Sequence, residues 1–283
     1  MALDDPWPAF KTCWQRIDRA HVHHRAFAEF WDRFVEEKPY ARILNIRDDG
    51  RGGVWLEPRY QTFPPTLGIY LGEMLYQLRA ALDSCIYDAV CQELGVQFHG
   101  EPPDARSLEF PICTSPQQFK DARWKLGPLS DQRRGIVEAV QPYHAAQLSP
   151  EDQVSSVGRS LGILNDWARK DRHRRLHVMG SWASRALVKV HCPPGICVVF
   201  LDTYPGGTLE YGSKLASFRL DPWRPGIEIE VETDFTVEVS LDEGPPPCVA
   251  VDTFDHRLRA IMHAVREVAH RLETCEWRPG AAC

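Results

Sequence analysis

The chain has 283 residues, of which 43% are hydrophobic, enough to build a sizeable folded core. Its formal net charge of −6 gives no general attraction to phosphate backbones or anionic membranes. The acidic, proline-interrupted N-terminus and the lack of a long apolar run predict neither a secretory signal nor a membrane span, and nine cysteines without a CxxC pair predict reduced thiols in a cytoplasmic protein.

Two long helices joined by a β-hairpin are predicted in the first third of the chain. The first helix covers about residues 8–37. Alternating apolar residues around Gly50, Gly52 and Gly53 predict the hairpin, and these glycines form a turn, because no helix with a GK[ST] pattern follows them. The second helix covers about residues 65–95, and its apolar stripe consists of Leu71, Leu75, Leu78, Leu82, Ile86 and Ala89.

The middle of the chain predicts two more helices. One runs from Asp131 to Val140 and is stopped by Pro142. The other starts after Ser149, which has the side chain of an N-cap, with Pro150 at its first helical position. Together with the first two, these helices form a predicted bundle of about four.

Beyond Gly180 the period of the apolar residues changes from helical to alternating, which predicts antiparallel strands. The longest alternation, from Ile227 to Leu241, has acidic residues on its other side and exceeds the usual strand length, so a bend is expected near Thr233 and Asp234. A last helix is predicted over about residues 253–273.

The predicted fold class is therefore α+β: an N-terminal bundle of about four helices with a small β-hairpin, followed by an antiparallel β-sheet and a C-terminal helix. The change of period divides the chain into a helical part, 1–179, and a part with the sheet and the last helix, 180–283. The sequence leaves open whether these parts are two domains or one continuous domain.

The sharpest polar constellation joins the second and fourth predicted helices. Arg79 and Asp83 are one turn apart on an edge of the second helix, and Asp171 falls on the apolar face of the fourth. If the two helices pack antiparallel, these groups meet in an ion-pair network, because a carboxylate on an apolar face needs a cationic partner. The candidate network residues are Glu73, Arg79, Asp83, Asn165, Asp171, His173 and Arg174.

The motifs GEMLYQLRAALDS, FPI, QPY, ARKDRHRRL and GGTLEYGSKLASFRL resemble a family of uncharacterised, largely actinobacterial proteins. Its members typically show G-E-x-L-H-x-L-R-S-A-L-D-H and D-K-H-R-x-L. The resemblance covers most of the chain and implies that the same polar set is shared. This chain departs from the pattern at Tyr76 and Ser84, where the family often has histidine, and at Arg172, where it often has lysine. The family implies no activity.

A weaker resemblance is to the HEPN superfamily of helical-bundle RNases, which use an arginine and a histidine four to six residues apart. Arg172 and His177 fit this spacing, as do other arginine–histidine pairs in the chain. The resemblance implies a metal-independent RNA-cleaving or phosphate-handling protein, with His173 or His177 in proton transfer and Asp171 orienting the imidazole. The phosphate would be held by Arg79, Arg172 and Arg174, and the basic cluster at 169–175 would attract RNA.

The alternative is a non-enzymatic binding or interaction module in which Arg79, Asp83, Asp171 and Arg174 form a structural lock. Function would then lie on the acidic sheet face or on an exposed apolar patch. Candidate partners are RNA, another protein or a second copy of the chain, and the sequence does not decide among them.

Two other patterns have simpler structural explanations. His21 and His24 share the apolar face of the first helix, which favours core hydrogen bonds over metal ligation. The G-x-S-x-G pattern at residues 158–162 lies inside a predicted helix, whereas a nucleophile elbow needs a strand before its serine. We predict no cofactor and no metal.

Overall fold

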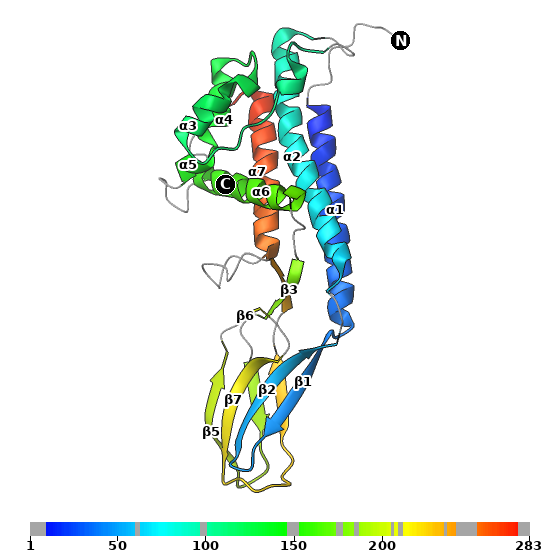
Figure 1. Ribbon diagram of the computed structural model, residues 1–283, viewed down its shortest axis with the longest axis vertical. Coiled ribbons are helices and arrows are strands. Elements are labelled where there is room, and N and C mark those ends of the chain that lie inside the picture. Colours follow the sequence, from blue (N-terminus) through cyan, green and yellow to red (C-terminus); the bar gives the residue numbers. More distant parts are fainter. Residues whose placement is uncertain are drawn as a thin grey trace. The chain divides into compact units, whose positions relative to one another are not determined.

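The structure is a computed structural model that describes residues 10–59, 63–96, 101–145, 153–173, 178–183, 187–204, 207–208, 212–234, 237–241 and 254–276. Its fold class is α+β, as predicted (Figure 1). The helices are α1 (Lys11–Glu36), α2 (Pro65–Leu94), α3 (Pro116–Ala122), α4 (Asp131–Ala139), α5 (Pro142–Ala145), α6 (Gln153–His173) and α7 (Phe254–Thr274), with 3-10 turns η1 (Ala105–Ser107) and η2 (Arg123–Leu126). The strands are β1 (Tyr40–Ile46), β2 (Arg51–Pro58), β3 (Val178–Ala183), β4 (Leu187–His191), β5 (Cys197–Thr203), β6 (Gly207–Thr208), β7 (Ser213–Asp221), β8 (Glu230–Asp234) and β9 (Val237–Leu241).

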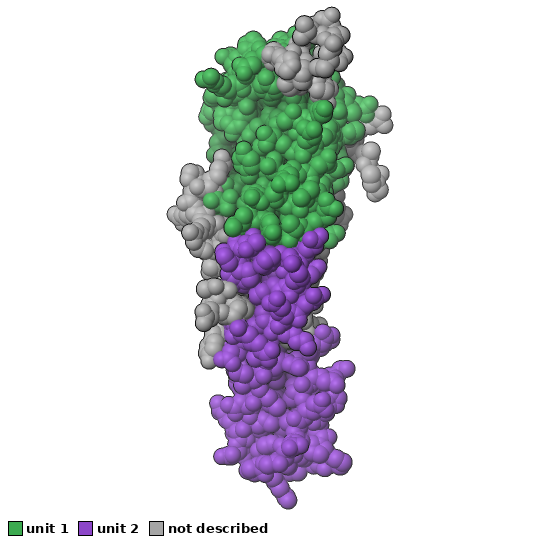
Figure 2. Space-filling view, turned by 90° about the vertical axis from the view of Figure 1, so that its right-hand side faces the viewer, with its two compact units in different colours: residues 1–27, 69–176, 255–283 green, residues 28–68, 177–254 purple. Residues whose placement is uncertain are grey.

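The chain forms two compact units, coloured separately in Figure 2. Unit 1 comprises residues 1–27, 69–176 and 255–283, and unit 2 comprises residues 28–68 and 177–254. This division differs from the one predicted at residues 179 and 180: the last helix belongs with the helical unit, and the early hairpin belongs with the strands. Among the described residues, no helix is both long enough and apolar enough to cross a bilayer.

The core of unit 1 is organised around α2. All six residues of its predicted apolar stripe are completely buried, and so are residues outside the stripe, such as Ala81, Val90 and Cys91. Gly95 ends the helix with a positive φ of 62°, the conformation that favours glycine after a helix. A helix buried on most of its sides is the centre of a bundle and not one of its walls.

α1 and α7 flank this central helix. Trp14 donates a hydrogen bond from Nε1 to Glu273 (3.0 Å), joining α1 to α7, and Arg16 donates to Gln77 (3.3 Å), joining α1 to α2. The apolar face of α7 is buried, including Leu258, Ile261, Val265, Val268 and Leu272. Apolar burial therefore holds the three helices together, and the polar contacts fix their register.

A buried arginine joins α4 to the ends of two long helices. Arg133, only 5% exposed, donates to the carbonyl oxygens of Ala89 (3.1 Å) and Leu272 (3.0 Å) near the C-terminal ends of α2 and α7. It also pairs with Glu93 (3.1 Å) and contacts Gln92. A cation is favourable at a helix C-terminus, because the final carbonyl groups have no partner within the helix.

The described strands of unit 2 form three antiparallel sheets, with strand orders β1-β2-β7-β5, β6-β3-β9 and β4-β8. One buried cluster connects the four-stranded sheet to the β4-β8 ribbon, and it includes Val54 and Leu56 of β2, Val188 of β4 and Phe218 of β7. The long alternation predicted over residues 227–241 is divided between β8 and β9, as the expected bend requires. Glu230, Glu232 and Asp234 of β8 are exposed, which gives the ribbon the predicted acidic face.

The register of the four-stranded sheet separates a buried face from an outer face. Gly52 is paired with Phe218 and Val54 with Ala216, and Val54, Ala216 and Phe218 are buried. Next to the Gly52–Phe218 pair, Arg51 lies directly opposite Arg219. Since side chains alternate between the two faces of a strand, Arg51 and Arg219 project together from the outer face.

Candidate functional site

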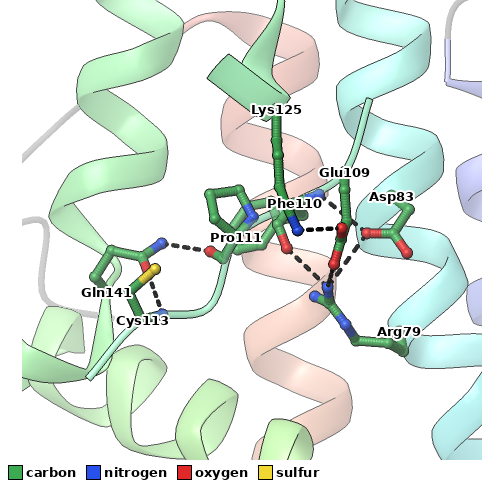
Figure 3. A network of polar contacts seen from close by, with 8 residues as sticks. All are labelled: Arg79, Asp83, Glu109, Phe110, Pro111, Cys113, Lys125 and Gln141. Carbon is green, nitrogen blue, oxygen red and sulfur yellow. Dashed lines mark hydrogen bonds and ion pairs between the residues drawn. The ribbon is translucent and has the colours of Figure 1, made fainter. Parts of the chain in front are cut away.

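The predicted helix-edge residues Arg79 and Asp83 hold an extended segment of the chain, residues 108–113, which we call the strap (Figure 3). Arg79 donates from Nη2 to the carbonyl oxygen of Phe110 (2.9 Å) and to Glu109 Oε1 (3.0 Å), and its ion pair with Asp83 spans 3.5 Å. Asp83 accepts a hydrogen bond from the amide of Phe110 (3.0 Å). The two residues thus bind both backbone groups of Phe110 from one helix turn.

The other parts of the strap are also held through polar contacts. Lys125 approaches Glu109 Oε2 to 2.6 Å, and the fully buried Gln141 accepts from the amide of Cys113 (2.8 Å). Gln141 also donates to the carbonyl oxygen of Pro111 (2.9 Å) (Figure 3). Backbone groups without a strand partner must be satisfied when buried, and these side chains supply the partners.

The carboxyl groups of this network have opposite pKa shifts. Burial raises the pKa of Asp83, although Arg79 and the amide of Phe110 oppose the rise. Desolvation alone would also raise the pKa of Glu109, but Lys125 and Arg79 together outweigh it and leave that pKa lowered. The two shifts identify Glu109 as the well-paired carboxylate and Asp83 as the one that ionises at a cost.

Asp171 of α6 lies beside Gly72 of α2 and not beside Arg79, the neighbour expected for antiparallel helices. A Cβ placed on Gly72 would lie 2.8 and 2.9 Å from the two carboxylate oxygens of Asp171, so the absence of a side chain at Gly72 makes room for them. Among the described residues, the ion pairs of Arg79 lead to Asp83 and Glu109, and none leads to Asp171. The antiparallel packing on which that meeting depended is absent, because α6 runs across α2 and not along it (Figure 1).

The remaining predicted site residues divide into two groups. Glu73 contacts His23 of α1 (2.9 Å), and Asn165 is half-buried on α6. The backbone of Arg172 and His173 ends α6, and their side chains, like the whole of Arg174 and His177, lie outside the described residues. The catalytic and phosphate-binding roles assigned to these four residues stay predictions.

The G-x-S-x-G pattern lies inside α6, as predicted, and serves packing. A Cβ on Gly158 would lie 3.1 Å from the carbonyl oxygen of Gln141, so the missing side chain lets α6 approach the start of α5 closely. Ser160 donates its hydroxyl hydrogen bond to the carbonyl oxygen of Ser156 (2.9 Å), one turn earlier in the same helix. This serine has neither the backbone position nor the partner of a nucleophile.

Two histidines of α1, His23 and His24, contact carboxylates of neighbouring helices. His24 approaches Asp255 of α7 to 3.2 Å, and burial, reinforced by Arg266, lowers the pKa of His21. In the part of the chain that the structure describes, no group of three His, Cys, Asp or Glu side chains is arranged to hold a metal ion.

A second candidate site lies on the outer face of the four-stranded sheet, around a hollow of about 470 Å³. We call this surface the basic face. Among the residues that the structure describes, its lining contains four basic residues and no carboxylate. The basic face consists of Asn45, Arg47, Arg51, Gly52, Trp55, Phe200, Lys214, Ser217, Phe218 and Arg219.

The basic residues of this face have few local counter-charges. Arg51 pairs with Asp49 of its own turn at 3.7 Å, and Arg47, Lys214 and Arg219 form no ion pair with another described residue. This surface was not predicted from the sequence, although Lys214 and Arg219 alternate with buried residues along β7. What the sequence lacked was the pairing of β7 with β2, a strand about 160 residues earlier.

No protein-family model, no curated protein and no solved structure matches this chain, so its function is to be inferred from its own residues.

Proposed function

We propose that this protein is a non-catalytic binding module whose basic face takes a phosphate-bearing polyanion, and that the Arg79 network is a structural lock. One observation carries the proposal: four basic residues surround a single hollow in a chain with a net charge of −6. The positive charge is concentrated at one place on a molecule that is negative as a whole. This concentration favours binding of an anionic ligand at that place over a general attraction of anions to the protein.

The opposed arginines strengthen this proposal. Residues directly opposite each other in an antiparallel pair have Cα atoms about 5 Å apart. Like charges at such a position destabilise a sheet. Arg51 and Arg219 occupy this position on β2 and β7. An anion bound between the two guanidinium groups would replace repulsion by attraction, and guanidinium groups suit phosphate oxygens.

The contacts of Arg79 support the lock in place of the catalytic alternative. Its side chain is only 11% exposed, and Nη2 is engaged by the strap. Nη1 is buried and has no hydrogen-bond partner among the described residues, so it faces protein and not solvent. A phosphate clamp needs guanidinium nitrogens that converge on a solvent-reachable point.

The test is a calorimetric titration with inorganic polyphosphate at about 50 and 200 mM salt. If all four basic residues contact phosphates, affinity should fall roughly 50-fold between these salt concentrations, by the single-strand salt slope. The double variant Arg51→Gln/Arg219→Gln should bind at least about tenfold more weakly and lose roughly half of that slope. Arg106→Gln, at an exposed site in unit 1, is the matched control and should bind like the parent.

Two results would overturn the proposal. Absence of polyphosphate binding, or equal binding by the double variant and the parent, would remove the basic face as the binding surface. Cleavage of a mixed RNA pool in EDTA that is lost in His173→Ala, with normal melting of that variant, would establish catalysis and refute the non-catalytic assignment.

A further inference from the structure

We infer that the polyanion is a single-stranded nucleic acid, with phosphates on the arginines and lysine of the basic face and unstacked bases on Trp55 and Phe200. This inference rests on the proposed function and adds the chemical class of the ligand. Charge alone would recognise any polyphosphate, whereas aromatic rings placed among the charges need a ligand that also has flat apolar groups.

The aromatic residues lie in the same cross-strand rows as the basic ones. Phe200 of β5 is opposite Arg219, which is itself opposite Arg51. Trp55 of β2 is opposite Lys214 of β7. Each row therefore combines a cation with a ring on one face of the sheet, the combination that single-strand-binding grooves use.

The Phe200 ring is open to a ligand, and the Trp55 ring is partly exposed. Phe200 is 53% exposed, a large value for a phenylalanine on a strand. The Lys214 ammonium lies over Trp55 at 5.4 Å and over Tyr204 at 6.0 Å from the ring centroids, within the range of a cation–π interaction. A phosphate binding Lys214 would therefore lie beside two aromatic rings.

Glycine at position 53 shapes the surface between these rows. A Cβ there would lie 2.8 Å from the Trp55 ring and 3.1 Å from the Lys214 side chain. The side chains of Trp55 and Lys214 therefore occupy the space that a larger residue at position 53 would need. Gly53 is paired with Ser217 of β7, so only small residues of β2 and β7 lie between the two rows. Asp202, opposite Ser217, shares this face but does not line the hollow.

These features favour a single strand over a duplex. In a duplex the bases are stacked and paired, and only backbone and groove edges meet a protein surface. Exposed rings beside phosphate-binding cations contribute affinity only when the bases are free to stack on them.

The experiment measures fluorescence anisotropy of labelled 20-nucleotide probes with the full chain, using oligouridylate, its deoxy counterpart and a duplex RNA of the same length. The key variant is Phe200→Leu, which keeps an apolar residue at the strand position and removes the aromatic face. Trp124→Leu, which replaces a 64% exposed aromatic in unit 1, is the matched control. Polyphosphate binding is measured for the same proteins.

We expect Phe200→Leu to bind oligouridylate roughly 5- to 100-fold more weakly, the loss of one stacked base, and polyphosphate within about twofold of the parent. Trp124→Leu should bind both like the parent. Polyphosphate binding without single-strand binding would overturn this inference and leave the proposed function intact, as would duplex binding that is tighter and insensitive to Phe200→Leu. If the parent protein binds neither polyphosphate nor the single strands, both this inference and the proposed function are overturned. Comparison of the ribo- and deoxyribo-probes decides whether RNA or DNA is the preferred ligand.

Discussion

Replacing Arg79 by methionine tests the lock directly. Methionine keeps most of the apolar stem of the arginine and removes the guanidinium. The variant loses the hydrogen bonds to Glu109 and to the carbonyl oxygen of Phe110, together with the ion pair to Asp83. Asp83, whose pKa burial already raises, then loses its nearest cation.

The expected cost follows from these contacts. Hydrogen bonds to charged groups contribute about 1.5–3 kcal/mol each, and breaking a buried ion pair costs about 3–5 kcal/mol. Asp83 and Glu109 are 36% and 41% exposed, so water replaces part of what is lost. We therefore expect Arg79→Met to lower the free energy of unfolding by about 2–4 kcal/mol.

Urea unfolding followed by far-UV circular dichroism measures this loss, and hydrogen exchange at the Phe110 amide reports whether the strap is released. Lys125→Met is the matched control: it removes one partly exposed partner of Glu109 and leaves Arg79 in place, so it should cost about 1 kcal/mol or less. The lock is refuted if Arg79→Met unfolds within about 0.5 kcal/mol of the parent, or if Lys125→Met is equally damaging.

Two further predictions concern the same unit. When the pH is raised from about 4 to about 7, the Asp83→Asn variant should gain more stability than the parent. The raised pKa of Asp83 means that its ionisation in the parent opposes folding as the pH rises. Over the same rise in pH, Glu109→Gln should gain less stability than the parent. The lowered pKa of Glu109 gives stability that is present above its ordinary pKa and lost as the pH falls. Urea midpoints at the two pH values measure these changes, and a difference from the parent in the same direction for both variants would contradict this assignment. Gly158→Val should lower stability by about 1–3 kcal/mol, because its side chain meets the backbone at Gln141, whereas Gly135→Ala, with nothing within 4 Å of its added methyl group, should raise stability by about 0.5–1 kcal/mol. Thermal melts that rank these two glycine variants in the opposite order would show that α6 and α5 are not closely packed.

Local pattern was sufficient for most of the elements. The apolar stripe from Leu71 to Ala89 predicted the buried face of α2, and the alternation around Thr233 predicted two strands with a bend. The helix α3 was overlooked, although Ser115 followed by Pro116 carries a start signal of the same kind as Ser149 and Pro150. Pro142, predicted to stop a helix, also starts the short α5.

Pairing between distant segments was not available from the sequence. Arg79 was correctly placed on a helix edge, but its partners Glu109 and Phe110 belong to a segment without helical or strand periodicity. The basic face depends on β2 lying beside β7, and a period of two residues reveals which residues share a face but not which strand is adjacent. For the same reason the sequence could not show that Asp171 lies against Gly72 of α2, since periodicity does not determine how two helices cross.

The way unit 1 is assembled from three separate stretches has a consequence for biosynthesis. Trp14 of α1 and Glu273 of α7, joined by a hydrogen bond, are 259 positions apart, and the buried face of α7 completes the core around α2. During translation the N-terminal helices therefore emerge long before the helix that covers them, while every strand of unit 2 has already been synthesised. The helices made first must keep their apolar surfaces from aggregating until α7 is synthesised. A ribosome stalled before residue 254 would therefore present the strands of unit 2 together with a helical unit that lacks α7.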